Sequence, residues 1–270
     1  MNWFERIVYF LQGTMERPQP FGWFHWMWIG FTVISLVFLY FCRKKYNEKQ
    51  LKSVLLIYGV TALILEIIKQ IIWSFNYDSV TNIGYWKYQW YSAPFQLCTT
   101  PIFVSLICSF LKDNKIRKAL LSYMAFVTIL GSLITMILPD SCFVETIEIN
   151  IHTMWLHAGS LVVSIYLLMV GEIKPTKNNF KSSIIVFLIF VILAQILNIT
   201  IYNSGILNGD TFNMFYISPY FISTLPVFDV IQKSVPYIIY LISYLFVLIF
   251  GAWAIYKSSA LFRKKYHNNK

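Results

Sequence analysis

The chain has 270 residues, of which 57% are hydrophobic, 19% aromatic and only 13% charged. Soluble globular chains carry about 25% charged residues, so this deficit excludes an ordinary soluble domain and places the chain in a lipid bilayer. A formal net charge of +10 would suit nucleic-acid binding, but its distribution along the chain explains it as a topology signal. We therefore expect no nucleic-acid partner.

The first 20 residues predict an interfacial segment on the outer side. Six apolar residues there have helical spacing, as in a short helix that lies on the outer leaflet. They are Trp3, Phe4, Ile7, Val8, Phe10 and Leu11.

Seven apolar segments follow, each about long enough to cross ~30 Å of hydrocarbon. They cover residues 21–41, 53–75, 94–111, 119–138, 151–171, 182–202 and 235–256. This pattern predicts an all-α fold, a polytopic membrane helix bundle with seven transmembrane helices. The chain then divides into the outer interfacial segment 1–20, the transmembrane domain 21–256 and a basic cytoplasmic tail 257–270.

Basic residues gather on alternate connections between these spans. Seventeen of the 22 Lys and Arg residues lie in the loops after spans one, three and five and in the C-terminal tail. Positively charged loops stay in the cytoplasm, so the N-terminus is expected outside and the C-terminus inside. With seven spans the two ends must face opposite sides, as the charge pattern requires.

Ionisable residues inside spans are costly and point to function or to pairing. Glu66 and Lys69 are three residues apart and share one helix face, either as a self-neutralising pair or with Glu66 pointing into a polar cavity that supports an active site. His152 and His157 are about 140° apart on their helix, so they do not form a zinc pair. No ligand spacing favours a metal. We interpret His152 as solvated near the interface and His157 as deeper, either structural or catalytic.

Cys98 lies in the stretch "WYSAPFQLCTTP", where three interpretations stay open: core packing, a disulfide with Cys142, or a nucleophile. Pro94 is expected in the first turn of span three, which puts Cys98 near an electropositive helix N-terminus that activates thiols. Pro101 cannot donate to the carbonyl of Leu97 and so frees a polar backbone group beside the thiol. Gln96 adds a side-chain donor.

Cys98 and His157 are predicted at the same depth. Each lies ~6–9 Å inside the outer end of its span at 1.5 Å per residue, on helices that run in the same direction. A thiol and an imidazole within hydrogen-bond range form an activated nucleophile. At this level lie the ester bonds of outer-leaflet phospholipids.

The sequence resembles the YwaF-type family of bacterial integral membrane proteins. These are related to a vertebrate transmembrane acyltransferase that remodels ether phospholipids and more distantly to androgen-induced lipid hydrolases. The resemblance rests on Glu66 and Trp73, "APFQLC", "LHAGS" and "FNMFYISPYF…LPVFD", which contains Asn213, Met214, Pro219 and Asp229. It implies that Cys98 and His157 are a catalytic pair and that the chain is a multi-pass protein of the bacterial plasma membrane.

These observations lead to a hypothesis of a lipid acyltransferase or lipid-ester hydrolase that acts on outer-leaflet lipids through a Cys–His acyl-enzyme. The expected partner is a membrane phospholipid or lysolipid, with no cofactor, because cytosolic acyl-CoA cannot reach an outer site. The supporting residues are Gln96, His152, Glu66 and Asn213, and the substrate-binding residues are Trp73, Trp90 and Trp155. Alternatives are a non-enzymatic transporter or lipid-binding protein, and an accessory subunit with a Cys98–Cys142 disulfide.

Overall fold

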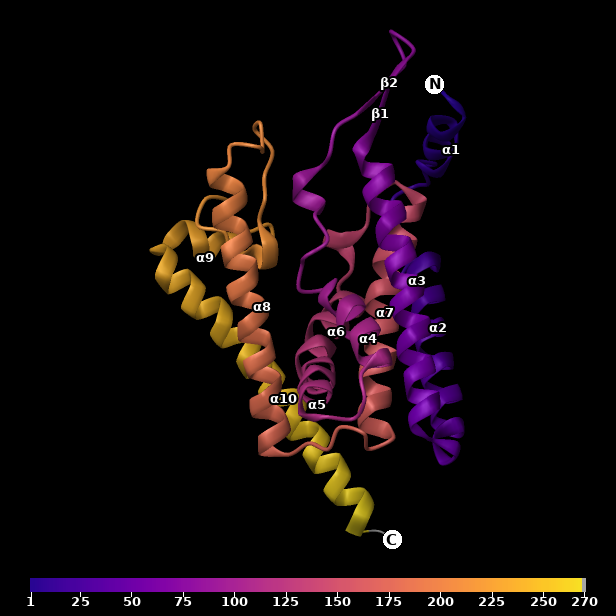
Figure 1. The fold of residues 1–270 in the computed structure, drawn as a ribbon, viewed down its shortest axis with the longest axis vertical. Helices are drawn as coiled ribbons and strands as arrows, with labels where there is room; N and C mark the ends of the chain where they lie inside the picture. Colours follow the sequence, from indigo (N-terminus) through magenta and orange to yellow (C-terminus); the bar gives the residue numbers. More distant parts are fainter. Residues whose placement is uncertain (269–270) are drawn as a thin grey trace.

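Long helices run side by side along the molecule, and the N-terminus and C-terminus lie at opposite ends (Figure 1). This computed structural model describes residues 1–268. The elements in chain order are α1 (Trp3–Leu11), α2 (Trp23–Cys42), α3 (Glu48–Ser74), β1 (Phe75–Asp78), β2 (Ile83–Trp86), α4 (Thr100–Phe110), α5 (Lys115–Tyr123), α6 (Ile129–Ile137), α7 (Ile147–Met169), α8 (Lys177–Asn203), α9 (Phe228–Ser234) and α10 (Tyr237–Asn268).

The expected all-α membrane bundle is confirmed. Within residues 1–268, six helical stretches are long and apolar enough to cross a membrane. α5 and α6 form one of them, joined by a π-helical turn at Met124–Thr128 whose five residues are all buried. The other five are α2, α3, α7, α8 and α10.

The third predicted span differs from the expectation of seven full-length helices. Only the eleven residues of α4 are helical there, which is too short to cross alone. Pro101 occupies the first turn of α4, the place predicted for Pro94, because a residue without an N–H is tolerated there, where the backbone N–H groups have no helical acceptor. The outer half of this passage, residues 87–99, is therefore extended, turn and 3₁₀ backbone.

The end of the bundle near the N-terminus, which we call the outer end after the predicted topology, carries α1 and a two-stranded hairpin (Figure 1). β1 pairs antiparallel with β2, with Phe75 opposite Trp86. The Gln12 side chain donates hydrogen bonds to the carbonyls of Ile72 (2.8 Å) and Phe75 (2.7 Å) at the end of α3. The helix predicted within residues 1–20 is present as α1, and Gln12 holds it against the outer end of the bundle.

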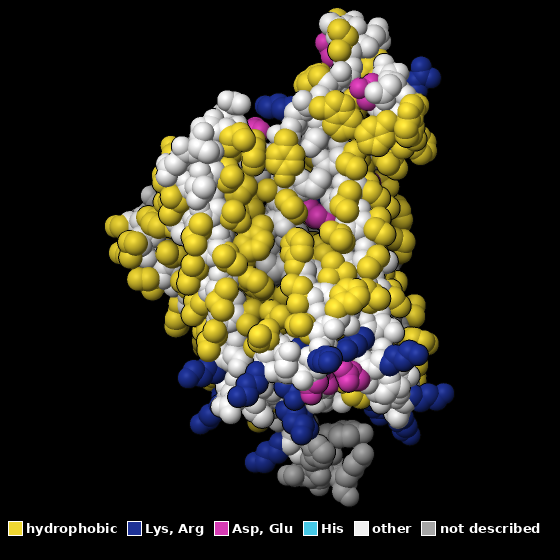
Figure 2. All heavy atoms as spheres, viewed as in Figure 1, with side chains coloured by type: hydrophobic (Ala, Val, Ile, Leu, Met, Phe, Trp, Pro, Cys, Tyr) yellow, Lys and Arg dark blue, Asp and Glu magenta, His cyan; other side chains and the backbone are white. Residues whose placement is uncertain are grey.

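Positive side chains gather at the other end, around the lower ends of the helices in Figure 2. Buried Arg117 there pairs with Glu172 at 3.1 Å and donates from Nε to the carbonyl of Cys108 at 3.1 Å. The Tyr46 hydroxyl donates to the same Glu172. We call Tyr46, Arg117 and Glu172 the lower clasp, because they join the α2–α3 and α7–α8 connections to α5.

α3 and α7 approach closely at a glycine, next to the residues of the candidate site. A Cβ added to Gly159 would lie 2.7 Å from two carbons of the Tyr58 ring, so only glycine fits without movement. The Tyr58 hydroxyl donates to the carbonyl of Leu156 at 3.2 Å. α3 and α7 therefore approach closely at the small residue Gly159, and the side chain in contact is that of Tyr58.

Candidate functional site

A buried network of charges joins α3 to α7. One oxygen of Glu66 lies 2.7 Å from Lys69 Nζ, and the other lies 2.8 Å from His152 Nε2. Gln70 Nε2 donates to Glu66 at 2.8 Å and to the carbonyl of Ser92 at 2.6 Å, and Lys69 donates to the same carbonyl at 3.2 Å. The network therefore also binds the non-helical segment 87–99.

The network confirms the predicted Glu66–Lys69 pair and corrects the interpretation of His152. That imidazole is 4% exposed and bonded to Glu66, so it is not solvated. Burying the pair is tolerable because each charge has a partner and the remaining lone pairs are hydrogen-bonded. The histidine could not be placed from sequence, since its partner is 86 residues away.

Cys98 lies in a turn just before α4 and is half-buried. The carbonyl of Leu97, which Pro101 leaves without a helical donor, accepts from the Thr100 hydroxyl at 2.8 Å. In the described part of the chain, the backbone N–H groups of Leu97 and Cys98 donate to no other residue. The turn thus presents the Leu97 N–H, and the Cys98 N–H against its own thiol, without an acceptor in any other described residue.

Cys98 also lies near the charged network. Glu66 and Lys69 are within electrostatic range of its thiol, as is Tyr58. Tyr58 in turn bonds to the carbonyl of Leu156, the residue before His157. Tyr58 is therefore linked to both predicted catalytic segments, and sequence reasoning missed it because aromatic side chains are common in spans.

His157 is buried at 8% exposure. Its ring makes no hydrogen bond to any residue within 1–268, and none joins it to Cys98. The described structure thus leaves the His157 ring without a hydrogen-bond partner, and the predicted match in depth with Cys98 stays a prediction.

Two predicted supporting residues act in loop packing. The Gln96 amide donates to the carbonyl of Asn213 at 3.0 Å and accepts from the N–H of Phe215 at 2.8 Å. The Asn213 side chain binds the backbone at Ser218, Phe221 and Ile222. Since both ends of the Gln96 amide are engaged, the expected contribution of Gln96 to an oxyanion site would require these bonds to break.

The three predicted substrate-binding tryptophans make three different kinds of contact. The Trp73 ring centre lies 5.7 Å from Lys69 Nζ, which is a cation–π distance. The Trp90 ring packs edge-on against Phe212. Trp155 Nε1 donates to the Thr61 hydroxyl at 3.1 Å. Trp73 is the one that contacts the charged network.

Sequence reasoning missed Glu148, one turn before His152. Both of its carboxyl oxygens are buried, and neither has a partner in the described structure. His152 Nδ1 is likewise buried and without a partner there. Glu148 lies within electrostatic range of Glu66 and Lys69, so it belongs to the same polar region. In the searched residues 1–268, no three His, Cys, Asp or Glu side chains are arranged to hold a metal.

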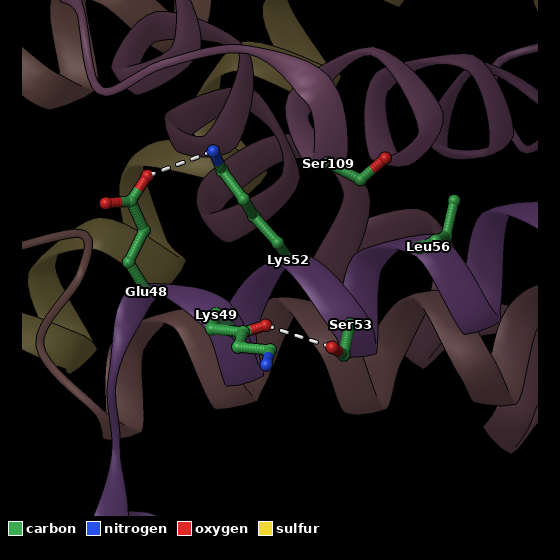
Figure 3. Close-up of a pocket in the computed structure, with 6 residues that line it drawn as sticks. All are labelled: Glu48, Lys49, Lys52, Ser53, Leu56 and Ser109. Carbon is green, nitrogen blue, oxygen red and sulfur yellow. Dashed lines mark hydrogen bonds and ion pairs between the residues drawn. The ribbon is translucent and has the colours of Figure 1, made fainter.

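Two surface pockets differ in place and lining. One, of about 450 Å³, adjoins the site and includes Glu66 and Gln70. The other, of about 350 Å³, lies at the lower end between α3 and α4 (Figure 3). There Lys52 pairs with Glu48 at 3.2 Å and the Ser53 hydroxyl donates to the carbonyl of Lys49. Because that pocket lies at the opposite end of α3, we exclude it from the candidate site.

Comparison with known proteins gives one match. The model of the TMEM164 family matches residues 20–256, which includes Cys98, His157 and the charged network. No curated protein and no solved structure matches the chain. The narrower resemblance to YwaF-type proteins stays a prediction.

Proposed function

The chain belongs to the TMEM164 family, and from this premise we propose that it modifies membrane lipids by acyl transfer or ester hydrolysis at Cys98. The observation that carries the proposal is the turn before α4, where a half-buried thiol lies beside two backbone N–H groups that donate to no other described residue. Irregular backbone at membrane depth is tolerated where it is buried in protein or lines a cavity. A nucleophile with donors for an oxyanion is a function that such a turn can serve.

The first half of the reaction forms a thioester. His157 accepts the proton of the Cys98 thiol, and the sulfur attacks the carbonyl carbon of a lipid ester. The developing oxyanion accepts hydrogen bonds from the N–H groups of Leu97 and Cys98. As the intermediate collapses, the carbon–oxygen bond breaks and the imidazolium returns its proton to the departing lipid alkoxide.

The second half releases the acyl group. A lysolipid or glycolipid hydroxyl, or water, loses its proton to His157 and attacks the thioester carbonyl. The carbon–sulfur bond breaks, an ester or a free acid forms, and the thiolate recovers the proton. The reaction needs no cofactor, because the acyl donor is another lipid.

The charged network has a positioning role in this proposal. Lys69 and Gln70 both hold the carbonyl of Ser92, six residues before Cys98. Glu66 fixes Lys69 and the His152 ring. These bonds fix the backbone of the reactive segment at a depth where water cannot satisfy its polar groups. The predicted supporting residues Glu66 and His152 thus act through the segment that carries Cys98.

The direct test uses the purified full chain in nanodiscs with a radiolabelled diacyl phospholipid and a lysolipid. Cys98→Ala should abolish acyl transfer and the acyl mass on the protein, a loss of at least about 10³-fold. Cys42→Ala is the matched thiol control and should retain turnover. Full turnover by Cys98→Ala would overturn the proposal.

The same assay distinguishes the roles of His157 and His152. His157→Ala should lower turnover by about 10²–10⁴-fold, the range for loss of a general base. Hydroxylamine-sensitive acyl label on Cys98 should fall in parallel. Normal acylation in His157→Ala together with loss in His152→Ala would assign the base to the His152–Glu66 pair instead.

The pocket beside Glu66 favours a second candidate, a non-enzymatic lipid-binding or transport protein. In that case lipid would bind with no mass added to Cys98. Intact-mass analysis of the chain after incubation with a diacyl phospholipid distinguishes the two functions.

A further inference from the structure

Two neighbouring aromatic residues, Phe215 and Tyr216, have left-handed backbone. Their φ angles are +58° and +59°, a conformation that glycine adopts readily and that bulky side chains rarely adopt. Strained backbone of this kind persists only where surrounding contacts fix it, and it gathers at active sites and ligand clamps. The pair is therefore a candidate functional element that sequence reasoning did not identify.

Side chains from two long helices hold this segment in place. The Asn198 amide of α8 accepts from the N–H of Met214 at 2.7 Å and donates to the carbonyl of the same residue at 3.0 Å. The Tyr240 hydroxyl of α10 donates to the carbonyl of Tyr216. The backbone on both sides of the strained pair is thus fixed by partners that are distant in the chain.

The strained pair is also bound to the chain just before Cys98. Gln96 accepts from the N–H of Phe215 at 2.8 Å, and the ring centres of Phe95 and Phe215 lie 5.7 Å apart. Tyr216 follows directly and is within electrostatic range of the Cys98 thiol. The segment that carries the proposed nucleophile and the strained pair therefore pack against each other.

Four tyrosines are within electrostatic range of Cys98, and their hydroxyls differ in what they can still bind. They are Tyr58, Tyr123, Tyr216 and Tyr244. The hydroxyls of Tyr58 and Tyr123 already make hydrogen bonds of 3.2 and 2.6 Å. Tyr244 is 1% exposed, so a substrate does not reach it. Tyr216 is partly exposed, and its hydroxyl makes no hydrogen bond to another residue within 1–268.

The Tyr216 side chain is suited to donate to a bound molecule. Its neighbours Phe215 and Ile217 are 0% exposed, whereas Tyr216 and the Cys98 thiol both keep accessible surface. Burial raises the pKa of Tyr216 above its ordinary value of 10.0, so the phenol stays protonated at neutral pH. Tyrosine hydroxyls are among the side-chain donors that form oxyanion holes.

We propose that the Tyr216 hydroxyl is a further catalytic group, which donates a hydrogen bond to the carbonyl oxygen of the lipid ester as the Cys98 thiolate adds to the carbonyl carbon. The electron pair of the carbonyl π bond moves onto that oxygen, and the phenol keeps its proton. This role rests on the acyl transfer proposed at Cys98. The strained backbone fixes the donor before the reaction begins, as electrostatic stabilisation of a transition state requires.

The test compares Tyr216→Phe with Tyr220→Phe, in the full chain in nanodiscs with a radiolabelled diacyl phospholipid. Tyr216→Phe should slow single-turnover acylation of Cys98 by about 10²–10³-fold, the loss for one oxyanion donor. Its unfolding midpoint should match that of the parent chain, because the deleted hydroxyl has no partner in the described structure. Tyr220→Phe makes the same change on a 40% exposed ring of the same loop and should acylate like the parent chain.

Alkylation by iodoacetamide distinguishes an effect on the carbonyl from an effect on the thiol. This reaction displaces iodide from carbon and forms no oxyanion, so Tyr216→Phe should alkylate Cys98 at the parental rate. An alkylation rate that falls as far as the acylation rate would overturn the oxyanion role, because the phenol would then act on the thiol. Parental acylation by Tyr216→Phe would overturn it as well.

Failure of the acyl-transfer function and failure of the Tyr216 role give different results. A parent chain that forms no acyl label on Cys98 overturns acyl transfer, and the role of Tyr216 with it. A parent chain that acylates Cys98 no faster than Tyr216→Phe does overturns the role of Tyr216 alone. A lower unfolding midpoint with unchanged acylation per folded molecule would assign Tyr216 a structural role instead.

Discussion

The outer and lower halves of this bundle bury polar groups in different ways. In the lower half, the Arg117–Glu172 pair of the lower clasp ties regular helices and their short connections together. In the outer half, the Glu66 network holds a stretch of non-helical backbone, and Glu148 and Gln70 keep buried atoms without partners in the described structure. Arg117 Nη2 in the lower clasp also lacks a partner there, so a buried atom without a partner does not by itself mark a site. What distinguishes the outer half is the irregular backbone that carries Cys98 and the pocket that includes Glu66.

The largest expected effect concerns the outer network. Glu66→Gln leaves the Lys69 ammonium buried without its counter-charge, which should lower the free energy of unfolding by about 3–5 kcal/mol. It should also slow alkylation of Cys98 by maleimide, because Lys69 would no longer hold the Ser92 carbonyl in place. Thermal unfolding in detergent and the maleimide rate measure the two effects. The double variant Glu66→Gln/Lys69→Met should recover stability; if it does not, charge pairing is not the cause.

The lower clasp should behave differently. Arg117→Met removes a buried guanidinium that pairs with Glu172 and donates to the carbonyl of Cys108. It should lower the free energy of unfolding by about 3 kcal/mol, the lower end of the range for breaking a buried pair. The loss is limited because Glu172 is partly exposed and keeps the hydrogen bond from Tyr46. The maleimide rate at Cys98 should stay unchanged below the unfolding temperature. Lys118→Ala, from an exposed pair, is the control and should cost under 1 kcal/mol. A changed Cys98 rate in Arg117→Met would show that the two halves are coupled.

A smaller effect is expected where α3 meets α7. Gly159→Ala places a methyl group against the Tyr58 ring and should cost about 1–3 kcal/mol through overpacking. Gly131→Ala in α6 has open space around it and should be neutral or stabilise by up to about 1 kcal/mol. Differential scanning fluorimetry of the two variants compares them directly. Equal midpoints would mean that the close approach at Gly159 relaxes without cost.

The smallest effect is pH-dependent and lies in the lower clasp. Burial, followed by the hydrogen bond to Glu172, raises the pKa of Tyr46 above its ordinary value of 10.0. A raised pKa means that the neutral form is stabilised by folding, so this contribution is complete below pH 10 and is lost as pH rises further. Tyr46→Phe should cost about 1 kcal/mol at pH 8, with the difference from the parent chain shrinking above pH 10. A difference that stays constant up to pH 11.5 would contradict this assignment.

Disulfide pairing of Cys98 with Cys142 is the remaining prediction from the sequence. The structure has no disulfide between them, although the two cysteines are within electrostatic range. A thiol count on the denatured, non-reduced chain should give four reactive thiols. A count of two would favour the disulfide and remove Cys98 as a nucleophile.

The sequence by itself determined the membrane class, the helices and the asymmetry of charge. These follow from apolar runs of span length and from basic loops, both of which are local patterns. It also identified Glu66 with Lys69, because three-residue spacing on a helix is a local geometric rule. The sequence also predicted that Pro101 interrupts the backbone hydrogen bonds of the third span. Because Pro94 was predicted to start that helix, the non-helical backbone of its outer half was missed.

Tertiary structure decided the rest, because it depends on contacts between residues far apart in the chain. His152 binds Glu66 on another helix, Gln96 binds the loop around Asn213, and the Tyr58 hydroxyl binds the carbonyl of Leu156, next to His157. The pocket that includes Glu66 is also tertiary, since its walls come from α3, from the end of the hairpin and from the segment around the start of α4. In a bilayer, backbone without helical bonds must find its partners in distant side chains, and only the folded bundle shows which ones these are.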